Sequence, residues 1–448
     1  MSEAVAKVKI PADVVWGHPR GMIYIIFTEA WERFSFYGMQ ALLVLYLANH
    51  LLVDQRYQAV FGMPTLIEAT EAVFGTLAQQ ALATQLFGLY VGFIYLAPII
   101  GGWIGDRWVG RKRAVLAGAL SMSAGHLLMT QEALTLVAII FLIIGSGLLK
   151  GNLAAQVGML YAPDDSRRDR AYTLYNVSIN IGATLAPLAC GTLGELYGWH
   201  YGFGAAGVGM LVGVVVYLKG MPYLPDDPAE SSTRDANDGL KTAWAPLLSL
   251  FLLACLFWSA QAQIWNSYPL WISARVDRDV LGFVTPVTWF QSLDSFAVLV
   301  FSPIVLILWR WQQQHGREPL DASKLAIGFF IYACGFALLS LGELLSAGNS
   351  VLLVWPILLH FVLGAGFVYV GPIFLSMLSR IAPNNAAGTI IGAYYVSLFV
   401  GGVTSGWLGR FYEDLGPLGF WLIHAGLLIA GMVIIQSTRD VLNRSTAR

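Results

Sequence analysis

Residues 21–51 read GMIYIIFTEAWERFSFYGMQALLVLYLANHL, an apolar run interrupted near its start by Glu29, Glu32 and Arg33. About 20 apolar residues are enough for a helix to cross the hydrocarbon core of a bilayer. Each charge at the centre of such a helix costs about 2.5–3.5 kcal/mol on insertion scales, so three charges need pairing or water. At helical spacing Glu29 and Arg33 lie one turn apart, with Glu32 in the same sector. The stretch therefore predicts a membrane helix with one polar side.

Eleven further stretches have the length and apolar character of a membrane helix. The twelve expected spans are 21–49, 78–105, 113–130, 133–161, 170–194, 201–220, 243–273, 285–309, 323–346, 350–379, 387–412 and 417–437. Their apolar runs are continuous and do not alternate, which excludes an outer-membrane barrel. The composition agrees, since 57% of the chain is apolar and 12% is charged, against about a quarter charged in soluble domains. The sequence predicts an all-α membrane protein.

Basic residues indicate the orientation of these spans. With both termini in the cytoplasm, twenty of the 26 Lys and Arg residues fall on the cytoplasmic side and four on the opposite side. Cytoplasmic loops carry an excess of Lys and Arg. We therefore expect cytoplasmic termini and, in the absence of a cleavable leader pattern, an uncleaved chain in a bacterial inner membrane.

The polar stretch 221–241 divides the spans into six and six. It predicts an N-terminal six-helix bundle over 1–220, a cytoplasmic linker over 221–241 and a C-terminal six-helix bundle over 242–448. Two such bundles are typical of a secondary transporter of the major facilitator type, in which substrate binds near the midplane between the halves. Residues 50–75 are of mixed character and predict an ordered external loop.

Lys150 is a further charge inside an apolar run, LTLVAIIFLIIGSGLLK. Burial disfavours an unpaired ammonium, and the acids available in the first half are Glu29 and Glu32. We expect an ion-pair cluster of Glu29, Glu32, Arg33 and Lys150. When a glutamate in such a cluster takes a proton, its cation is released and can bind an anionic group of a substrate. The alternative is that these charges only hold two helices together.

Other residue patterns exclude several functions. The net charge of −1 gives no cationic face for nucleic acid. No phosphate-binding G-x-x-x-x-G-K-[ST] and no H-E-x-x-H occurs, and the three cysteines lie in apolar runs, so we expect no metal, no cofactor and no enzymatic activity. His126, His360 and His424 are interpreted mainly as packing residues, and Glu195 and Glu343 as interfacial.

Five segments are typical of one transporter family. They are the first-span E-x-x-E-R-F pattern at 29–34, GGWIGDRWVGRKRAV at 101–115, GSGLLKGN at 145–152, LYNVSINIGA at 174–183 and WFQSLDSF at 289–296. In order and spacing the chain resembles the proton-coupled oligopeptide transporter family, a branch of the major facilitator superfamily. The likeness is strong in the first half and loose in the second.

The resemblance implies roles for particular residues. Protons would bind at Glu29 and Glu32, beside Arg33 and Lys150. The substrate-binding residues would be Arg33, Tyr37, Tyr95, Lys150, Asn180, Trp258, Gln263, Asp294 and Tyr394. Asp106, Arg107 and Arg111 would form a cytoplasmic gate, since charge-assisted contacts at a helix end can break when the bundles move.

The second half departs from the family pattern at two acids. In FWSAQAQ, Ala262 stands where many members have Glu, and in FVYVGP, Phe367 stands where Glu is usual and Gly371 replaces Ser. Both acids are credited with holding the amino terminus of a peptide. Asp294 stands where relatives more often have Asn, and we expect it to supply the negative pole instead.

The expected function is a proton-coupled symporter that imports di- and tripeptides by alternating access, working as a monomer with protons as the coupling ion. Its partners would be a small peptide, protons and membrane lipid. Two alternatives stay open at this point. One is a symporter of the same fold for peptidomimetics or other small organic anions, which the missing acids favour. The other is a proton-driven drug exporter, against which the first-span motif argues.

Overall fold

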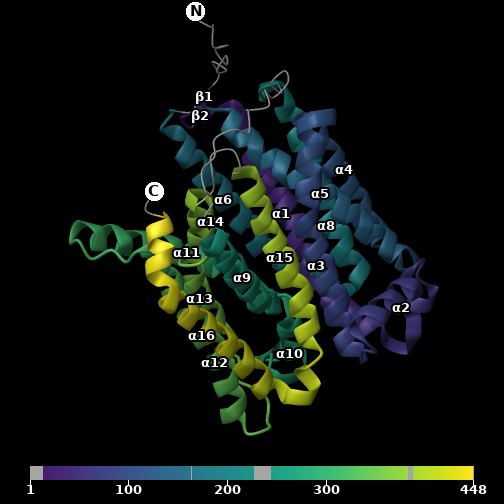
Figure 1. The fold of residues 1–448 in the computed structure, drawn as a ribbon. Coiled ribbons are helices and arrows are strands. Elements are labelled where there is room, and N and C mark those ends of the chain that lie inside the picture. Colours follow the sequence, from purple (N-terminus) through teal and green to yellow (C-terminus); the bar gives the residue numbers. More distant parts are fainter. Residues whose placement is uncertain (1–13, 163, 227–243, 382–386, 447–448) are drawn as a thin grey trace, which may run out of the picture.

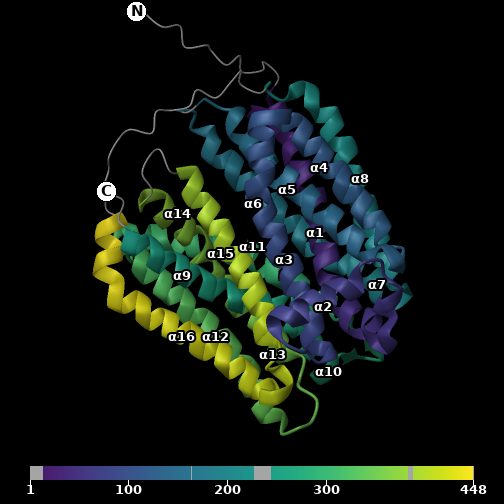
Figure 2. The ribbon, with the colours of Figure 1, turned by 45° about the vertical axis from the view of Figure 1, so that its right-hand side comes forward.

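The structure is a computed structural model that describes residues 14–162, 164–226, 244–381 and 387–446; for residues 379, 387–391, 445 and 446 it describes the backbone alone. Figure 1 and Figure 2 show two groups of long helices side by side, one from the first half of the chain and one from the second. A short hairpin of β1 (Val14–Val15) and β2 (His18–Pro19) precedes the first long helix, and β3 (Asp279–Val280) pairs with β4 (Phe283–Val284) in a second hairpin.

The helices of the first half are α1 (Arg20–Tyr46), α2 (Met63–Phe74), α3 (Gln79–Ile104), α4 (Arg111–Leu128), α5 (Thr135–Met159), α6 (Arg167–Ala186), α7 (Thr192–Tyr197) and α8 (Trp199–Gly220). Those of the second half are α9 (Trp244–Gln261), α10 (Ser267–Arg275), α11 (Thr288–Gln314), α12 (Asp321–Ser346), α13 (Val354–Val368), α14 (Gly371–Ile381), α15 (Ala387–Gly409) and α16 (Tyr412–Thr446).

A helix lies at each of the twelve predicted spans. Among the described residues, nine helical segments are long and apolar enough to cross a membrane. The segment Arg20–Leu51, which contains α1, passes the same test together with the bent segment Val53–Ala59 and makes a tenth. The other two predicted spans coincide with α4 and α15. α4 begins with Arg111, Lys112 and Arg113, three charges that lower its apolar character. The predicted all-α membrane fold is confirmed, and the expected external loop over 50–75 contains α2 and a 3₁₀ turn, Val53–Ala59.

Three predicted spans are broken helices. The span 170–194 passes through a π-helical turn at Pro187–Gly191 before α7, and the span 350–379 is α13 followed by α14. The span 243–273 is α9, a 3₁₀ turn at Ala262–Ile264, and α10. A proline lies near each break: Pro187 begins the π-helical turn, Pro372 is the second residue of α14, and Pro269 comes five residues after the 3₁₀ turn. Because proline lacks an N–H, the helical ladder loses a hydrogen bond there.

Small residues set the helix packing within the first half. The backbones of α4 and α5 meet at Gly118 and Gly145, where a methyl group on either glycine would lie within 2.7 Å of the carbonyl oxygen of the other. Such close backbone approach is the usual basis of helix association in lipid. On α8, Gly209 and Gly213 leave room for the side chains of Phe34 and Trp31 of α1.

Two helix pairs join the halves. Helix α3 packs along α15, and α6 packs against α11; the first pair is visible in Figure 1. Most of the predicted linker 221–241 lies outside the described residues, so the exact division of the chain remains a prediction.

Candidate functional site

The charged residues of α1 form a buried cluster. Arg33 Nε donates a hydrogen bond to Glu29 Oε1 at 2.7 Å and lies 2.6 Å from Glu32 Oε2. Tyr175, from α6, donates its hydroxyl to Glu29 Oε2 at 2.7 Å. Both glutamates are fully buried. The predicted grouping of Glu29, Glu32 and Arg33 is therefore present, with one cation between two carboxylates.

The two carboxylates of this cluster have different surroundings. Glu29 accepts hydrogen bonds from Arg33 and from Tyr175. Neither oxygen of Glu32 accepts a hydrogen bond from any described residue, although Glu32 lies in ionic contact with Arg33. Hydrogen bonds to a carboxylate stabilise its charged form. Glu29 is thus held as a partner of Arg33, whereas Glu32 retains unused acceptor capacity.

Lys150 lies beside the cluster on α5, but its nearest neighbours are aromatic rings. Its Nζ is 3.7 Å from the ring centroid of Phe36 and 4.9 Å from that of Tyr95. Among the described residues Nζ has no hydrogen-bond partner, while Glu29 and Glu32 are within electrostatic range. A cation over a ring face is stabilised by the ring quadrupole. Lys150 therefore does not form the close ion pair that was expected. Among the described residues it is a buried cation without a hydrogen-bonded anion.

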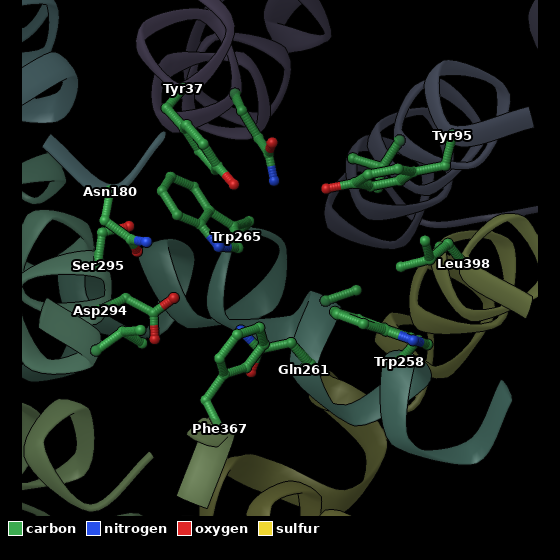
Figure 3. A pocket seen from close by; sticks show the side chains of 15 residues that line it. Tyr37, Tyr95, Asn180, Trp258, Gln261, Trp265, Asp294, Ser295, Phe367 and Leu398 are labelled. Atoms are coloured by element: carbon green, nitrogen blue, oxygen red, sulfur yellow. The ribbon is translucent and has the colours of Figure 1, made fainter. Parts of the chain in front are cut away.

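A cavity lies between the two groups of helices, and Figure 3 shows its lining. The space between its lining atoms is about 720 Å³, open water at its mouth included. In Figure 3 the hydroxyl groups of Tyr37 and Tyr95 and the carboxylate of Asp294 point toward its centre. The lining residues are Tyr37, Gln40, Val91, Tyr95, Asn180, Trp258, Gln261, Ala262, Trp265, Asp294, Ser295, Val298, Phe367, Leu398 and Gly402.

Five of the residues predicted to bind substrate line this cavity: Tyr37, Tyr95, Asn180, Trp258 and Asp294. Of the other four, Arg33 is one helical turn from Tyr37, and Lys150 lies against Tyr95. Tyr394 lies behind the wall, with its ring centroid 6.2 Å from that of Trp258. Gln263 is fully buried and donates to the Ser405 carbonyl at 3.0 Å.

Gln261 and Trp265 line the cavity, although the sequence analysis did not single them out. They flank the 3₁₀ turn after α9, which rotates the chain relative to a continuous α-helix. Gln261 ends α9 three residues after Trp258, so the two share a helix face and both line the cavity, whereas Gln263 points away from it. Pro269 in a predicted span is the signal that could have indicated this break.

One end of the cavity is closed by contacts between the halves. Glu195, in α7, accepts hydrogen bonds from the backbone N–H groups of Val287 and Thr288 at 2.8 and 2.9 Å, and from the Thr288 hydroxyl at 2.8 Å. At the other helix pair, Asn266 donates to the Thr84 carbonyl at 3.1 Å. These contacts lie at the end of the spans predicted to be external. Glu195, expected at the membrane interface, instead connects the two halves there.

The predicted gate residues lie at the opposite end. Arg111 Nε donates to Asp106 Oδ1 at 2.8 Å, and the Arg107 guanidinium is 5.9 Å from the ring centroid of Trp103. These contacts join residues of α3, α4 and the π-helical turn Gly105–Val109, all in the first half. The three residues are thus grouped as expected.

No group of three or more His, Cys, Asp or Glu side chains in the described ranges is placed to hold a metal ion.

Comparison with known proteins gives consistent results along nearly the whole chain. A family model described as Major Facilitator Superfamily matches residues 33–406. The chain is 27% identical to the peptide transporter YePEPT of Yersinia enterocolitica, over 94% of both chains. It is 28% identical to the di-/tripeptide transporter of Lactococcus lactis, over 95% of this chain and 96% of the relative.

A solved structure agrees with these relatives. The crystal structure of a peptide transporter POT in complex with sulfate superposes with a TM-score of 0.85 at 26% identity, over 97% of both chains. The match thus extends through the second half, where the motifs alone were only loosely similar. The chain belongs to the Major Facilitator Superfamily and, within it, to the proton-coupled oligopeptide transporter family.

Proposed function

We propose that this protein is a proton-coupled symporter that imports di- and tripeptides by alternating access. The relatives named as peptide and di-/tripeptide transporters support the substrate class. The observation that carries the proposal is the buried Glu29–Arg33–Glu32 cluster, one helical turn from the cavity residue Tyr37. It combines titratable groups with cations next to a space for a small substrate, which is what coupling requires.

Proton binding can be linked to substrate binding through Glu32. A proton on Glu32 removes one of the two negative charges that face Arg33. The cluster then has a surplus of positive charge, to which Lys150 contributes because it has no hydrogen-bonded anion among the described residues. A substrate carboxylate supplies the missing negative charge. Substrate and proton therefore stabilise each other, as symport requires.

The opposite pole of the cavity is Asp294, on α11. Its carboxylate points into the space between the halves, as Figure 3 shows. A peptide has a carboxylate at one end and an ammonium group at the other, so a site with cations on the first half and an acid on the second fits both ends. Tyr37, Tyr95 and Asn180 offer hydrogen-bonding groups to the peptide backbone between them.

The conformation is assigned as inward-facing. This assignment uses the positive-inside orientation, with both termini in the cytoplasm of a bacterial inner membrane. In that orientation the contacts of Glu195 and Asn266 close the external end of the cavity. The Asp106–Arg111 pair lies at the cytoplasmic end, where it can act as part of a gate. We propose bundles over 1–220 and 242–448, joined by the linker 221–241.

The mechanism uses the residues of one cavity and requires no contact between transporter copies. We therefore propose a functional monomer whose only coupling species is the proton. No catalytic step on the substrate is required.

A second substrate class is supported by one feature of the cavity. Ala262 and Phe367, which replace the acids of the family pattern, both line it. This makes part of the second-half wall apolar, which suits peptidomimetics or small organic anions without an amino terminus. Competition of labelled dipeptide uptake by a panel of such acids separates the two substrate classes.

The decisive experiment is uptake of radiolabelled di-alanine into proteoliposomes with an acidic or a neutral exterior. We expect uptake to be faster with the acidic exterior and to fall to the neutral level when a protonophore removes the gradient. Liposomes without protein are the control. Uptake that does not depend on the gradient would contradict symport, and inhibition by an inward gradient would indicate an exporter.

A further inference from the structure

A histidine that the proposed mechanism does not use lies behind Asp294. His360, on α13, is fully buried, and its Nδ1 is 3.8 Å from Asp294 Oδ1. This separation is within ion-pair range but too long for a hydrogen bond. On the other side of the ring, Nε2 lies 2.9 Å from the hydroxyl oxygen of Tyr268, on α10. The imidazole thus connects a cavity-lining carboxylate to a buried tyrosine.

The hydrogen bonds of Tyr268 bear on the protonation of this ring. Its hydroxyl donates to the Pro356 carbonyl at 3.5 Å, which leaves the oxygen to accept from His360 Nε2–H. In a neutral ring of this tautomer, Nδ1 is a bare lone pair that faces the Asp294 carboxylate. Two acceptors opposite each other repel. A proton on Nδ1 converts the repulsion into an ion pair.

The charge of Asp294 is matched by few groups in the described part of the chain. Among the described residues its one ion-pair partner is His360. The titratable groups that face the pair are tyrosines from three elements: Tyr268 on α10, Tyr332 on α12 and Tyr37 on α1. Helix α16 contributes the indole of Trp421, which contacts Tyr268. A mostly buried carboxylate in this setting requires a positive charge from His360 or from a ligand.

We propose that Asp294 and His360 form a second proton site, in which a proton and the amino terminus of the substrate exclude each other. The empty transporter keeps a proton on the pair, which neutralises the Asp294 charge. When the substrate ammonium reaches Asp294, it replaces that proton, which leaves from Nδ1 to the water of the cavity. The net charge at this site is then the same with and without bound peptide.

This inference rests on the proposed function, because it takes Asp294 as the receptor of a peptide amino terminus. It predicts that binding of a peptide with a free amino terminus releases more protons than binding of the same peptide with a blocked one. The Glu29–Glu32 cluster interacts with the carboxylate end, so its contribution is common to both peptides. The difference between the two peptides reports on the Asp294–His360 pair alone.

Isothermal titration calorimetry of the purified protein at pH 6 measures this difference. Titrations of di-alanine and N-acetyl-di-alanine in buffers of different ionisation enthalpy give the number of protons exchanged per peptide. We expect wild-type protein to release up to about one more proton with di-alanine, since one ionisable pair is involved. Equal proton numbers for the two peptides would overturn the inference, and this comparison needs no variant.

The variant His360→Asn assigns the proton to the ring, because asparagine can donate a hydrogen bond to Asp294 but does not titrate. We expect it to abolish the difference between the peptides. The matched control is His424→Asn. His424 is also fully buried, on α16, and bonds the Phe420 carbonyl through Nδ1 at 2.8 Å, with no carboxylate partner among the described residues. It should retain the wild-type difference.

A second measurement applies where the blocked peptide binds too weakly for calorimetry. Proton release at this pair makes the affinity for di-alanine rise with pH, whereas proton uptake at Glu32 makes it fall. The affinity of His360→Asn should therefore fall more steeply with rising pH than that of His424→Asn. The same slope in both variants would overturn the inference. Failure of wild-type protein to bind or transport di-alanine contradicts the proposed function instead, so the two failures are distinct.

Discussion

The carboxylate of Glu195 accepts a hydrogen bond from the backbone N–H of Thr288 at 2.9 Å and another from its hydroxyl at 2.8 Å. Glu195 belongs to the first half of the chain, and Thr288 begins α11 in the second. The N-terminus of a helix attracts a negative charge, because its first N–H groups have no partner within the helix. The contact therefore holds the halves together at one end of the cavity without a basic residue.

The first prediction concerns this contact. Glu195→Gln removes the charge but keeps one acceptor, so the closed end should open more often. Loss of a charge-assisted hydrogen bond of about 1.5–3 kcal/mol corresponds to a roughly 10- to 100-fold rise in the open population. The measurement is the external labelling rate of a Val91→Cys probe in a protein without other cysteines. Glu68→Gln, an exposed acid of α2, is the control; equal labelling in both variants contradicts the proposed latch.

The second prediction concerns Lys150. Lys150→Ala removes the buried cation that lies over Phe36 and Tyr95. We expect uptake driven by a pH gradient to be abolished, while exchange of substrate across the membrane remains measurable. The assay is paired uptake and counterflow of di-alanine in proteoliposomes. Lys219→Ala, at the exposed end of α8, should leave both activities intact. Unchanged gradient-driven uptake in Lys150→Ala refutes the coupling role.

The third prediction concerns Asp294. Asp294→Asn should weaken the binding of di-alanine by roughly 10- to 100-fold, since a hydrogen bond to a charged group contributes about 1.5–3 kcal/mol. Binding of N-acetyl-di-alanine should change little, because it has no ammonium group. Competition binding with both peptides measures the effect, and Asp279→Asn, in the exposed hairpin, is the control. A similar loss for both peptides removes Asp294 from the amino-terminus site.

The fourth prediction concerns pH and His18, which precedes α1. Burial, followed by the charges of Arg167 and Arg170, lowers the pKa of His18 from its usual 6.5. Its Nδ1 lies 2.7 Å from the Tyr161 hydroxyl. Because the folded state disfavours the protonated ring, the stabilisation is complete above about pH 6.5 and is lost as the pH falls below it.

Thermal unfolding of the purified protein between pH 5 and pH 7.5 tests this sign. The unfolding temperature of wild type should fall toward pH 5, and His18→Gln should reduce the size of that fall. His200→Gln, an exposed histidine of α8, provides the comparison. A steeper acid dependence in His18→Gln than in wild type contradicts the assignment.

The fifth prediction concerns helix packing at Gly101. A methyl group there would lie 2.1 Å from the Gly147 carbonyl oxygen of α5, whereas at the neighbouring Gly102 it would meet nothing within 4 Å. Gly101→Ala should therefore destabilise the protein by about 1–3 kcal/mol, the usual effect of overpacking. Gly102→Ala should have little effect. Size-exclusion chromatography after heating compares the two, and equal melting temperatures contradict the close packing.

Local spacing explains what the sequence could predict. Glu29 and Arg33 meet because residues four apart share a helix face, and the twelve helices follow from apolar length. Which side chains line a cavity is harder to predict where a helix is broken. Gln261, and not Gln263, lines the cavity, so the residue implied by the family resemblance was the wrong glutamine for the lining.

Contacts between distant segments were beyond the sequence. Glu195 and Thr288 are 93 residues apart, and His360 and Asp294 come from different helices. Glu343, expected at the interface, accepts a hydrogen bond from the indole of Trp271 and pairs with Arg275, two partners that the sequence did not indicate. Such pairs depend on the tertiary arrangement of whole helices, which periodicity does not encode.

The seam between α3 and α15 has a mechanical consequence. At its narrowest point Gly88 faces Gly402 and Gly406, where an added methyl group would lie 2.5 Å from the Gly402 carbonyl oxygen. Helix faces made of glycine can separate and pack together again without a change in any side-chain rotamer. Such a seam suits repeated opening and closing, and one methyl group at residue 88 would prevent the two helices from packing closely again.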